Sequence, residues 1–153
     1  MVETGQSVPK FSMPTDDAGE ISSDGLKGKK YVIYFYPKDD TPGCTTEAKG
    51  FTELKSEFAA AEVAVIGVSK DTLAKHEKFR AKHDLSVLLG SDEDGAVCEA
   101  FGVWIEKNMY GRKYMGIERA TFLVDADGIV QNIWRKVKVK GHVAAVLEAA
   151  KEL

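Results

Sequence analysis

The sequence predicts an α/β protein with a central mixed β-sheet flanked by helices and an extended hairpin at the N-terminus. Residues 31–36 and 63–68 are apolar runs rich in β-branched and aromatic side chains, a composition typical of strands buried on both faces. A helical pattern follows each run, and a hairpin pattern with a last helix ends the chain. We expect one domain over residues 1–153, because domains commonly contain about 100 to 200 residues.

The first half of the chain is expected to supply the hairpin and the centre of the sheet. Prolines and a glycine in 8–21 indicate an extended segment followed by a turn. The run 31–36 is predicted to be the central strand. After a turn-rich loop, Ala48, Phe51 and Phe58 recur at helical spacing, which predicts a helix over 41–61.

The second half repeats the alternation of strand and helix. Asp71 and Thr72 are predicted to begin a polar helix that ends near residue 83. A strand is expected at 86–89. A short helix is predicted over 94–102, where Gly102 ends it. Residues 104–116 are predicted to be a loop. The turn sequence 125–128 joins strands 120–124 and 129–134, and an amphipathic helix covers 141–153. This order of elements is that of thioredoxin.

Composition and charge exclude several classes of function. The net charge of −3 and the pI near 5.7 give no broad basic field, which argues against nucleic acid or an anionic membrane as partner. No run approaches the roughly 18 apolar residues of a membrane span. The first residues show neither a basic segment nor an apolar run, so we expect a cytoplasmic protein. With only two cysteines, any disulfide in that compartment would be transient.

Cys44 stands where a thiol becomes reactive. It follows a buried strand and a turn, in the first turn of the predicted helix, and a helix N-terminus favours the thiolate. Lowering a cysteine pKa from about 8.5 to about 6 takes about 3.4 kcal/mol, whereas the helix dipole contributes roughly 0.3 to 1 kcal/mol. We therefore expect a cation beside Cys44, and we expect the sulfur to lie on the core-facing side of the helix with Ala48 and Phe51.

The residues around Cys44 resemble the active-site signature of peroxiredoxins, Pro-x-x-x-Thr-x-x-Cys, at positions 37–44. Positions 41–48 are similar to the bacterioferritin comigratory protein, or peroxiredoxin Q, branch of that family. Further matching blocks lie at 89–92, 101–104, 116–123 and 125–128, so the resemblance covers nearly the whole chain. It implies a thioredoxin-like fold and a monomer.

The resemblance also implies a role for each matching residue. It makes Cys44 the peroxidatic cysteine, Thr41 its hydrogen-bonding partner, Pro37 a shield for the pocket and Arg119 the cation. Arg119 begins an apolar strand, where a guanidinium needs an anionic partner. Gly43 lets the backbone approach a small ligand.

Glu47 is interpreted in two ways from the sequence. One turn after Cys44, its carboxylate either pairs with Arg119 or another arginine, or lies exposed in the first turn of the helix.

The implied reaction is attack of the Cys44 thiolate on hydrogen peroxide or an alkyl hydroperoxide, which leaves a sulfenic acid. No metal or organic cofactor is required. The reductant is expected to be thioredoxin, glutaredoxin or a small thiol. The alternative is a peroxide-sensing redox switch that oxidises once without efficient turnover, and the third hypothesis, an inactive site, conflicts with intact Thr41, Cys44 and Arg119.

The second cysteine decides which catalytic scheme is expected. Relatives carry a resolving cysteine at the positions of Lys49 or Arg80, and neither is cysteine here. Cys98 lies beside Val97 in a short helix, which favours burial. We therefore expect one-cysteine turnover by an external thiol, with Cys98 as resolving cysteine the alternative.

The histidines show no metal-binding pattern. His76, His83 and His142 do not cluster with cysteines or carboxylates in the sequence, and we expect them at the surface or at helix ends.

Overall fold

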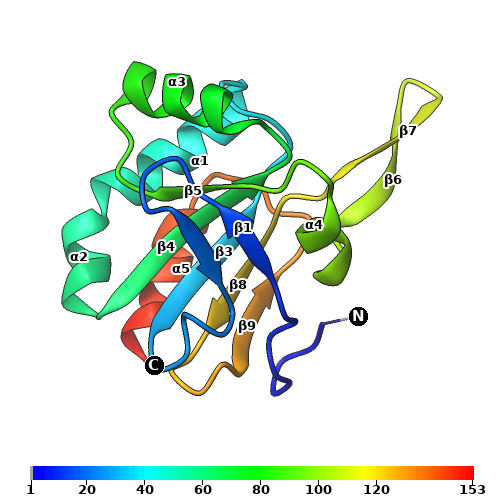
Figure 1. Ribbon diagram of the computed structural model, residues 1–153. Coiled ribbons are helices and arrows are strands. Elements are labelled where there is room, and N and C mark those ends of the chain that lie inside the picture. The colour runs from blue at the N-terminus through cyan, green and yellow to red at the C-terminus, as the bar shows by residue number, and fades with distance from the viewer. Residues whose placement is uncertain (1) are drawn as a thin grey trace.

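A five-stranded sheet forms the centre of the protein, with strand order β5-β4-β3-β8-β9. The computed structural model describes residues 2–153. β3 is parallel to β4 and antiparallel to β8, so the sheet is mixed, as predicted (Figure 1). The elements are β1 Ser12–Pro14, β2 Glu20–Ser22, β3 Lys30–Phe35, α1 Pro42–Glu53, α2 Lys55–Ala60, β4 Val63–Ser69, α3 Leu73–His83, β5 Leu88–Ser91, α4 Ala96–Ala100, β6 Trp104–Met109, β7 Arg112–Ile117, β8 Ala120–Val124, β9 Val130–Trp134 and α5 His142–Lys151.

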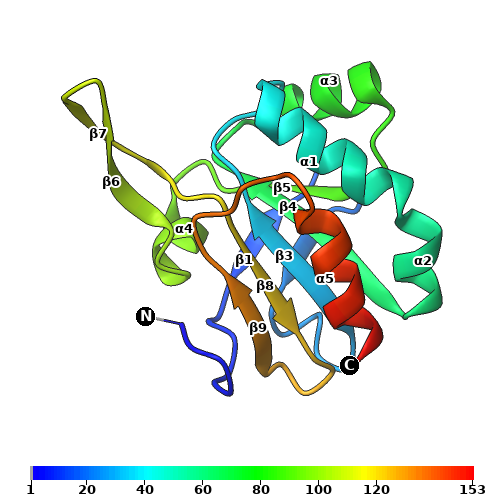
Figure 2. The same ribbon diagram turned by 180° about the vertical axis from the view of Figure 1, so that it is seen from behind.

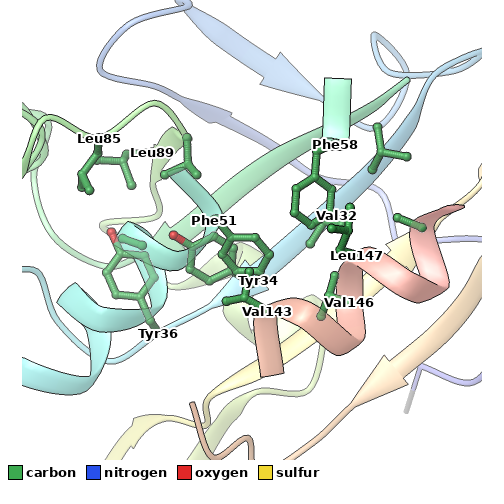
Figure 3. Packing of buried hydrophobic residues seen from close by; sticks show 14 of the residues in the cluster. Val32, Tyr34, Tyr36, Phe51, Phe58, Leu85, Leu89, Val143, Val146 and Leu147 are labelled. Carbon is green, nitrogen blue, oxygen red and sulfur yellow. The ribbon is translucent and has the colours of Figure 1, made fainter. Parts of the chain in front are cut away.

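The sheet separates two apolar clusters. On one face, Tyr34 of β3 stacks on Phe51 of α1 with ring centroids 4.7 Å apart, and residues of α2, α3 and α5 complete the cluster (Figure 3). On the other face, Ile33 and Phe35 pack with α4 and with the β1–β2 hairpin. Alternate residues of β3 thus enter opposite clusters, which explains why every residue of the strand after Lys30 is apolar or aromatic. Figure 2 shows α1 and α5 over the first face.

Two predicted elements were wrong in detail. The helix expected over 41–61 is divided at Leu54, whose backbone (φ −96°, ψ 13°) departs from helical geometry and separates α1 from α2. The loop expected over 104–116 is the antiparallel hairpin β6–β7, which projects from the body in both ribbon views. Tyr110 and Gly111 turn it with φ of 53° and 80°, the left-handed pair that a two-residue hairpin turn requires.

The fold brings two distant segments to one end of the sheet. Phe35, the last residue of β3, pairs with Ala120, the first residue of β8. The loop that leads to Cys44 leaves β3 at this end, and Arg119 enters β8 at the same end. α5 packs closely against α1 at Gly50. A methyl group added to this glycine would lie only 3.1 Å from the side chain of Val143 on α5. No helix among residues 2–153 is long and apolar enough to cross a membrane.

Candidate active site around Cys44

Cys44 lies in the first turn of α1 with its sulfur sheltered from solvent. The residue is 2% exposed and belongs to the apolar cluster with Ala48 and Phe51, as the helical spacing predicted. The first intrahelical hydrogen bond runs from the Thr45 amide to the Thr41 carbonyl. The Gly43 and Cys44 amides precede it and have no acceptor within the helix, so they are placed to donate to an anion at the sulfur.

Arg119 is the cation that the sequence predicted beside this sulfur. Its Nη2 donates to Cys44 Sγ at 3.3 Å, and its Nη1 donates to Glu47 Oε1 at 2.7 Å. Burial works against the guanidinium charge, but Glu47 and Cys44 outweigh it, and the pKa of Arg119 is raised above its ordinary value. The arginine therefore stays charged beside the thiol.

Glu47 pairs with Arg119 and is fully buried, so the interpretation of an exposed first-turn glutamate was wrong. Burial raises the pKa of Glu47 to about 7, although the charge and hydrogen bonds of Arg119 act in the opposite direction. The carboxyl group that orients Arg119 therefore has a pKa close to neutral pH.

Gly43 is a position where a side chain would disturb this arrangement. A Cβ atom there would lie 3.1 Å from Arg119 Nη2. The missing side chain makes room for the guanidinium.

Thr41 and Pro37 lie on the loop before Cys44, but Thr41 does not make the expected hydrogen bond to the Cys44 sulfur. The Thr41 hydroxyl donates to the Lys38 carbonyl at 2.9 Å, and within residues 2–153 no hydrogen bond joins it to Cys44. Pro37 is exposed to solvent. Thr41 occupies the N-cap position of α1 with an extended backbone, and its hydroxyl oxygen still has lone pairs with which to accept a hydrogen bond.

Cys98 is buried on the opposite face of the sheet. It is 0% exposed and packs with Val97 and Phe101, whereas Cys44 belongs to the other cluster. Burial raises the pKa of its thiol, and Asp92 adds to the effect. The predicted packing role of Cys98 agrees with this position.

The prediction for the histidines was right in part: His83 ends α3 and His142 begins α5, but His76 is buried within α3 and each of the three lies near a carboxylate. His76 is fully buried with Nδ1 2.6 Å from Asp39, and His83 Nε2 is 2.8 Å from Asp40. His142 begins α5 and is 6% exposed, with Nε2 3.9 Å from Glu47 Oε2. These partners are 37 to 95 positions away in the chain, so the sequence held no signal for them.

Lys107 is a second cation near the site that the sequence did not indicate. It lies on β6, in the hairpin next to the start of β8. Burial and Arg119 lower the pKa of Lys107, while Cys44 and Glu118 act in the opposite direction. The hairpin therefore adds a second lysine or arginine whose charge acts on Cys44.

Comparison with known proteins agrees with this geometry. The AhpC/TSA family model matches residues 4–133. Peroxiredoxin Bcp of Bacillus subtilis (strain 168) is 47% identical over 152 residues, which span 99% of this chain and 97% of the relative. Peroxiredoxin Bcp of Escherichia coli (strain K12) is 41% identical over 151 residues, with the same coverage of 99% and 97%.

Solved structures give the same result. A bacterioferritin comigratory protein of Xanthomonas campestris, studied for alkyl peroxide reduction, has a TM-score of 0.90 at 43% identity. Peroxiredoxin Q of Xylella fastidiosa, as a mutant, has a TM-score of 0.93 at 35% identity. Each comparison covers 99% of this chain and 97% of the other.

The chain therefore belongs to the AhpC/TSA family of thioredoxin-fold peroxidases. Within the family it is a peroxiredoxin of the bacterioferritin comigratory protein type, an enzyme that reduces peroxides at the expense of a thiol. The predicted family, fold and enzyme class are confirmed.

Proposed function

We propose that Cys44 is the peroxidatic cysteine and that Arg119 holds its thiolate and aligns the peroxide. The observation that carries the proposal is the 3.3 Å contact between Arg119 Nη2 and the sheltered sulfur. A guanidinium fixed in advance stabilises negative charge on sulfur and then on the leaving oxygen. The Gly43 and Cys44 amides and the Thr41 hydroxyl, once it turns from the Lys38 carbonyl, complete a set of donors around the reacting oxygens.

In the proposed reaction the Cys44 sulfur bonds to the terminal oxygen as the O–O bond breaks. Sulfur loses two electrons and becomes a sulfenic acid, and the departing oxygen takes a proton to leave as water or an alcohol. The substrates are hydrogen peroxide and alkyl hydroperoxides. Pro37 on the preceding loop borders the entrance to the pocket, and Glu47 fixes the orientation of Arg119. The reaction draws on no metal or organic cofactor.

We propose one-cysteine turnover, in which an external thiol attacks the sulfenic acid of Cys44. Water leaves as a mixed disulfide forms, and a second thiol releases the enzyme in its reduced form. Two observations support this scheme. First, Cys98 lies across the sheet from Cys44. Second, the position where some relatives carry a resolving cysteine is occupied by Arg80, which donates to Asp16 at 2.9 Å and to the Val87 carbonyl at 2.6 Å.

Consumption of peroxide over many turnovers tests this function. Wild type, Cys44→Ser and Cys98→Ser are compared with hydrogen peroxide and an alkyl hydroperoxide, with dithiothreitol or thioredoxin as reductant. We expect only Cys44→Ser to abolish turnover. If Cys98→Ser also stops it, the one-cysteine scheme is wrong. If wild type oxidises once and stops with every reductant, the protein is a redox switch instead.

We further propose that the chain works as a single domain, as a monomer and in the cytoplasm. Strands from both halves of the chain share one sheet, which supports a single folding unit. The thiol reductants that the scheme requires are abundant in that compartment. Light scattering of the purified protein tests the monomer, because a mass of twice 16.7 kDa would contradict it.

A further inference from the structure

Among residues 2–153, the second carboxylate oxygen of Glu47 has no hydrogen-bond partner. Glu47 is fully buried, and its Oε1 accepts from Arg119, but Oε2 is buried without a donor. An unsatisfied carboxylate oxygen inside a protein is costly. The imidazole of His142 faces it, with Nε2 3.9 Å from Oε2, which is close but beyond a direct hydrogen bond.

The ring of His142 is held firmly in this place. Its Nε2 lies 2.8 Å from the Thr121 hydroxyl, and its ring meets Trp134 edge-on with centroids 5.8 Å apart. Thr121 pairs with Trp134 on one side and with Tyr34 on the other. Thr121 and Trp134, both on the sheet, therefore fix the position of the ring. The packing of α5 on α1 brings the ring toward Glu47.

Four ionisable groups surround the Glu47 carboxyl. They are Arg119 before β8, Cys44 on α1, Tyr34 on β3 and His142 on α5. Burial, and then Arg119, lower the pKa of His142 to about 4, so its ring is neutral near pH 7. A neutral ring next to Glu47 adds no second positive charge. Its Nε2 bonds the Thr121 hydroxyl, and the ring held in this way lies against the Glu47 carboxyl and limits how far it can turn.

We propose that His142 is a positioning residue of the peroxidase reaction: fixed by Thr121, its imidazole holds the Glu47 carboxyl, which in turn holds Arg119 against the Cys44 sulfur. This inference rests on the proposed roles of Cys44 and Arg119. It adds His142, the first residue of α5, to the residues that organise the site. Loss of the imidazole leaves the carboxyl free to turn, and the guanidinium then loses its fixed distance to the sulfur.

A double-mutant cycle with Glu47 tests the proposal. The second-order rate constant for hydrogen peroxide is measured at pH 7 for wild type, His142→Ala, Glu47→Gln and the double variant, and unfolding by urea is measured for each. We expect His142→Ala to lower the rate constant about tenfold in wild type and less than about twofold in Glu47→Gln, because coupled residues are not additive. His142→Gln should restore most of the rate, since its amide also donates and accepts.

The controls separate positioning from folding. His83→Gln changes a histidine that bonds Asp40 instead, and it should leave the rate constant within about twofold. Thr121→Val removes the hydroxyl that fixes the ring and should reproduce part of the loss even if His142→Ala does not fold. The proposal is wrong if the loss is equal in both backgrounds, or if folded His142→Ala and Thr121→Val both retain full rate while Glu47→Gln is slow. Absence of turnover in wild type would instead overturn the proposed function.

Discussion

The guanidinium of Arg119 is shared between two groups, the Cys44 sulfur and the Glu47 carboxyl. Two different nitrogens make the two contacts, at 3.3 and 2.7 Å. A lysine would bring the same charge but only one nitrogen, which cannot hold both partners in fixed directions. The geometry of the fork, rather than the charge alone, therefore sets the position of the cation.

The shared guanidinium predicts a large effect of Arg119→Lys on catalysis. We expect the rate constant for hydrogen peroxide to fall about 100-fold, the range found when one preorganised donor is lost. Arg135→Lys is the matched control, because Arg135 also donates from two nitrogens, at 2.7 and 2.9 Å, but both reach the carboxylate of Glu118 and neither reaches Cys44. Equal rates in the two variants would contradict the role of the fork.

Gly43 predicts a separation of activity from stability. In Gly43→Ala the new methyl group would stand 3.1 Å from Arg119 Nη2 and push the guanidinium aside. Alanine is favoured over glycine within a helix by roughly 0.5 to 1 kcal/mol. We expect about tenfold slower peroxide reduction with unchanged or raised stability to urea. Lys49→Ala, on the exposed side of α1, should leave the rate unchanged; a fast Gly43→Ala enzyme would show that the guanidinium tolerates displacement.

At the scale of elements, helix α3 anchors the loop that precedes Cys44. Both ring nitrogens of buried His76 face acceptors, Asp39 Oδ2 at 2.6 Å and the Gly90 carbonyl at 2.9 Å. Protonation of both nitrogens satisfies both contacts. Burial opposes this charge, but the hydrogen bond and charge of Asp39 outweigh it, and the pKa of His76 is raised. Tyr36 donates to the other Asp39 oxygen at 2.6 Å, so the loop is fixed from two elements.

The neighbouring residue Asp40 makes a second anchor at the surface. It pairs with Lys82 and His83 at 2.7 and 2.8 Å. We predict that loss of the two anchors lowers the free energy of unfolding by very different amounts. Asp39→Asn should lower the free energy of unfolding by about 3 to 5 kcal/mol, because it removes the negative charge that pairs with buried His76 and replaces one of the two acceptor oxygens by a donor. Asp40→Asn should cost less than about 1 kcal/mol.

Urea denaturation at pH 7 compares these two variants. Because the residues are adjacent, they share the same loop and the same helix partner and differ mainly in burial. Similar losses for both would show that burial of the His76 pair does not control the anchor.

At the scale of the whole molecule, the sequence predicted what depends on local pattern. β3 and β4 were found because both faces of each strand are buried, and Cys44, Glu47 and Arg119 were found because the motif carries them. The β6–β7 hairpin was missed because it projects into solvent and most of its residues are exposed or half-buried, so no alternation of polar and apolar residues marks it. The histidine partners depend on tertiary contacts, such as the one between His76 and Asp39, 37 positions apart.

The pH dependence of stability follows from two groups of the site that act in opposite directions. The pKa of Glu47 rises from an ordinary 4.5 to about 7 on folding. Its contribution is complete below pH 4.5 and is lost as the pH rises toward 7. The pKa of His142 falls from 6.5 to about 4. Its contribution is complete above pH 6.5 and is lost as the pH falls toward 4. Between pH 4.5 and 6.5 the two contributions therefore oppose each other, each by at most about 1.4 kcal/mol per pH unit.

We expect single variants to unmask these two slopes in urea denaturation at half-unit steps from pH 4.5 to 6.5. The free energy of unfolding of Glu47→Gln, relative to wild type, should rise with pH, because wild type alone has the falling contribution. That of His142→Gln should fall with pH for the converse reason. His76 is present in every one of these variants, so its own contribution cancels in each difference from wild type. Glu53→Gln, which changes an exposed carboxyl on the same helix, should run parallel to wild type. If Glu47→Gln also runs parallel to wild type, the carboxyl is already ionised at pH 4.5 in the folded protein, and Arg119 outweighs burial at the centre of the site.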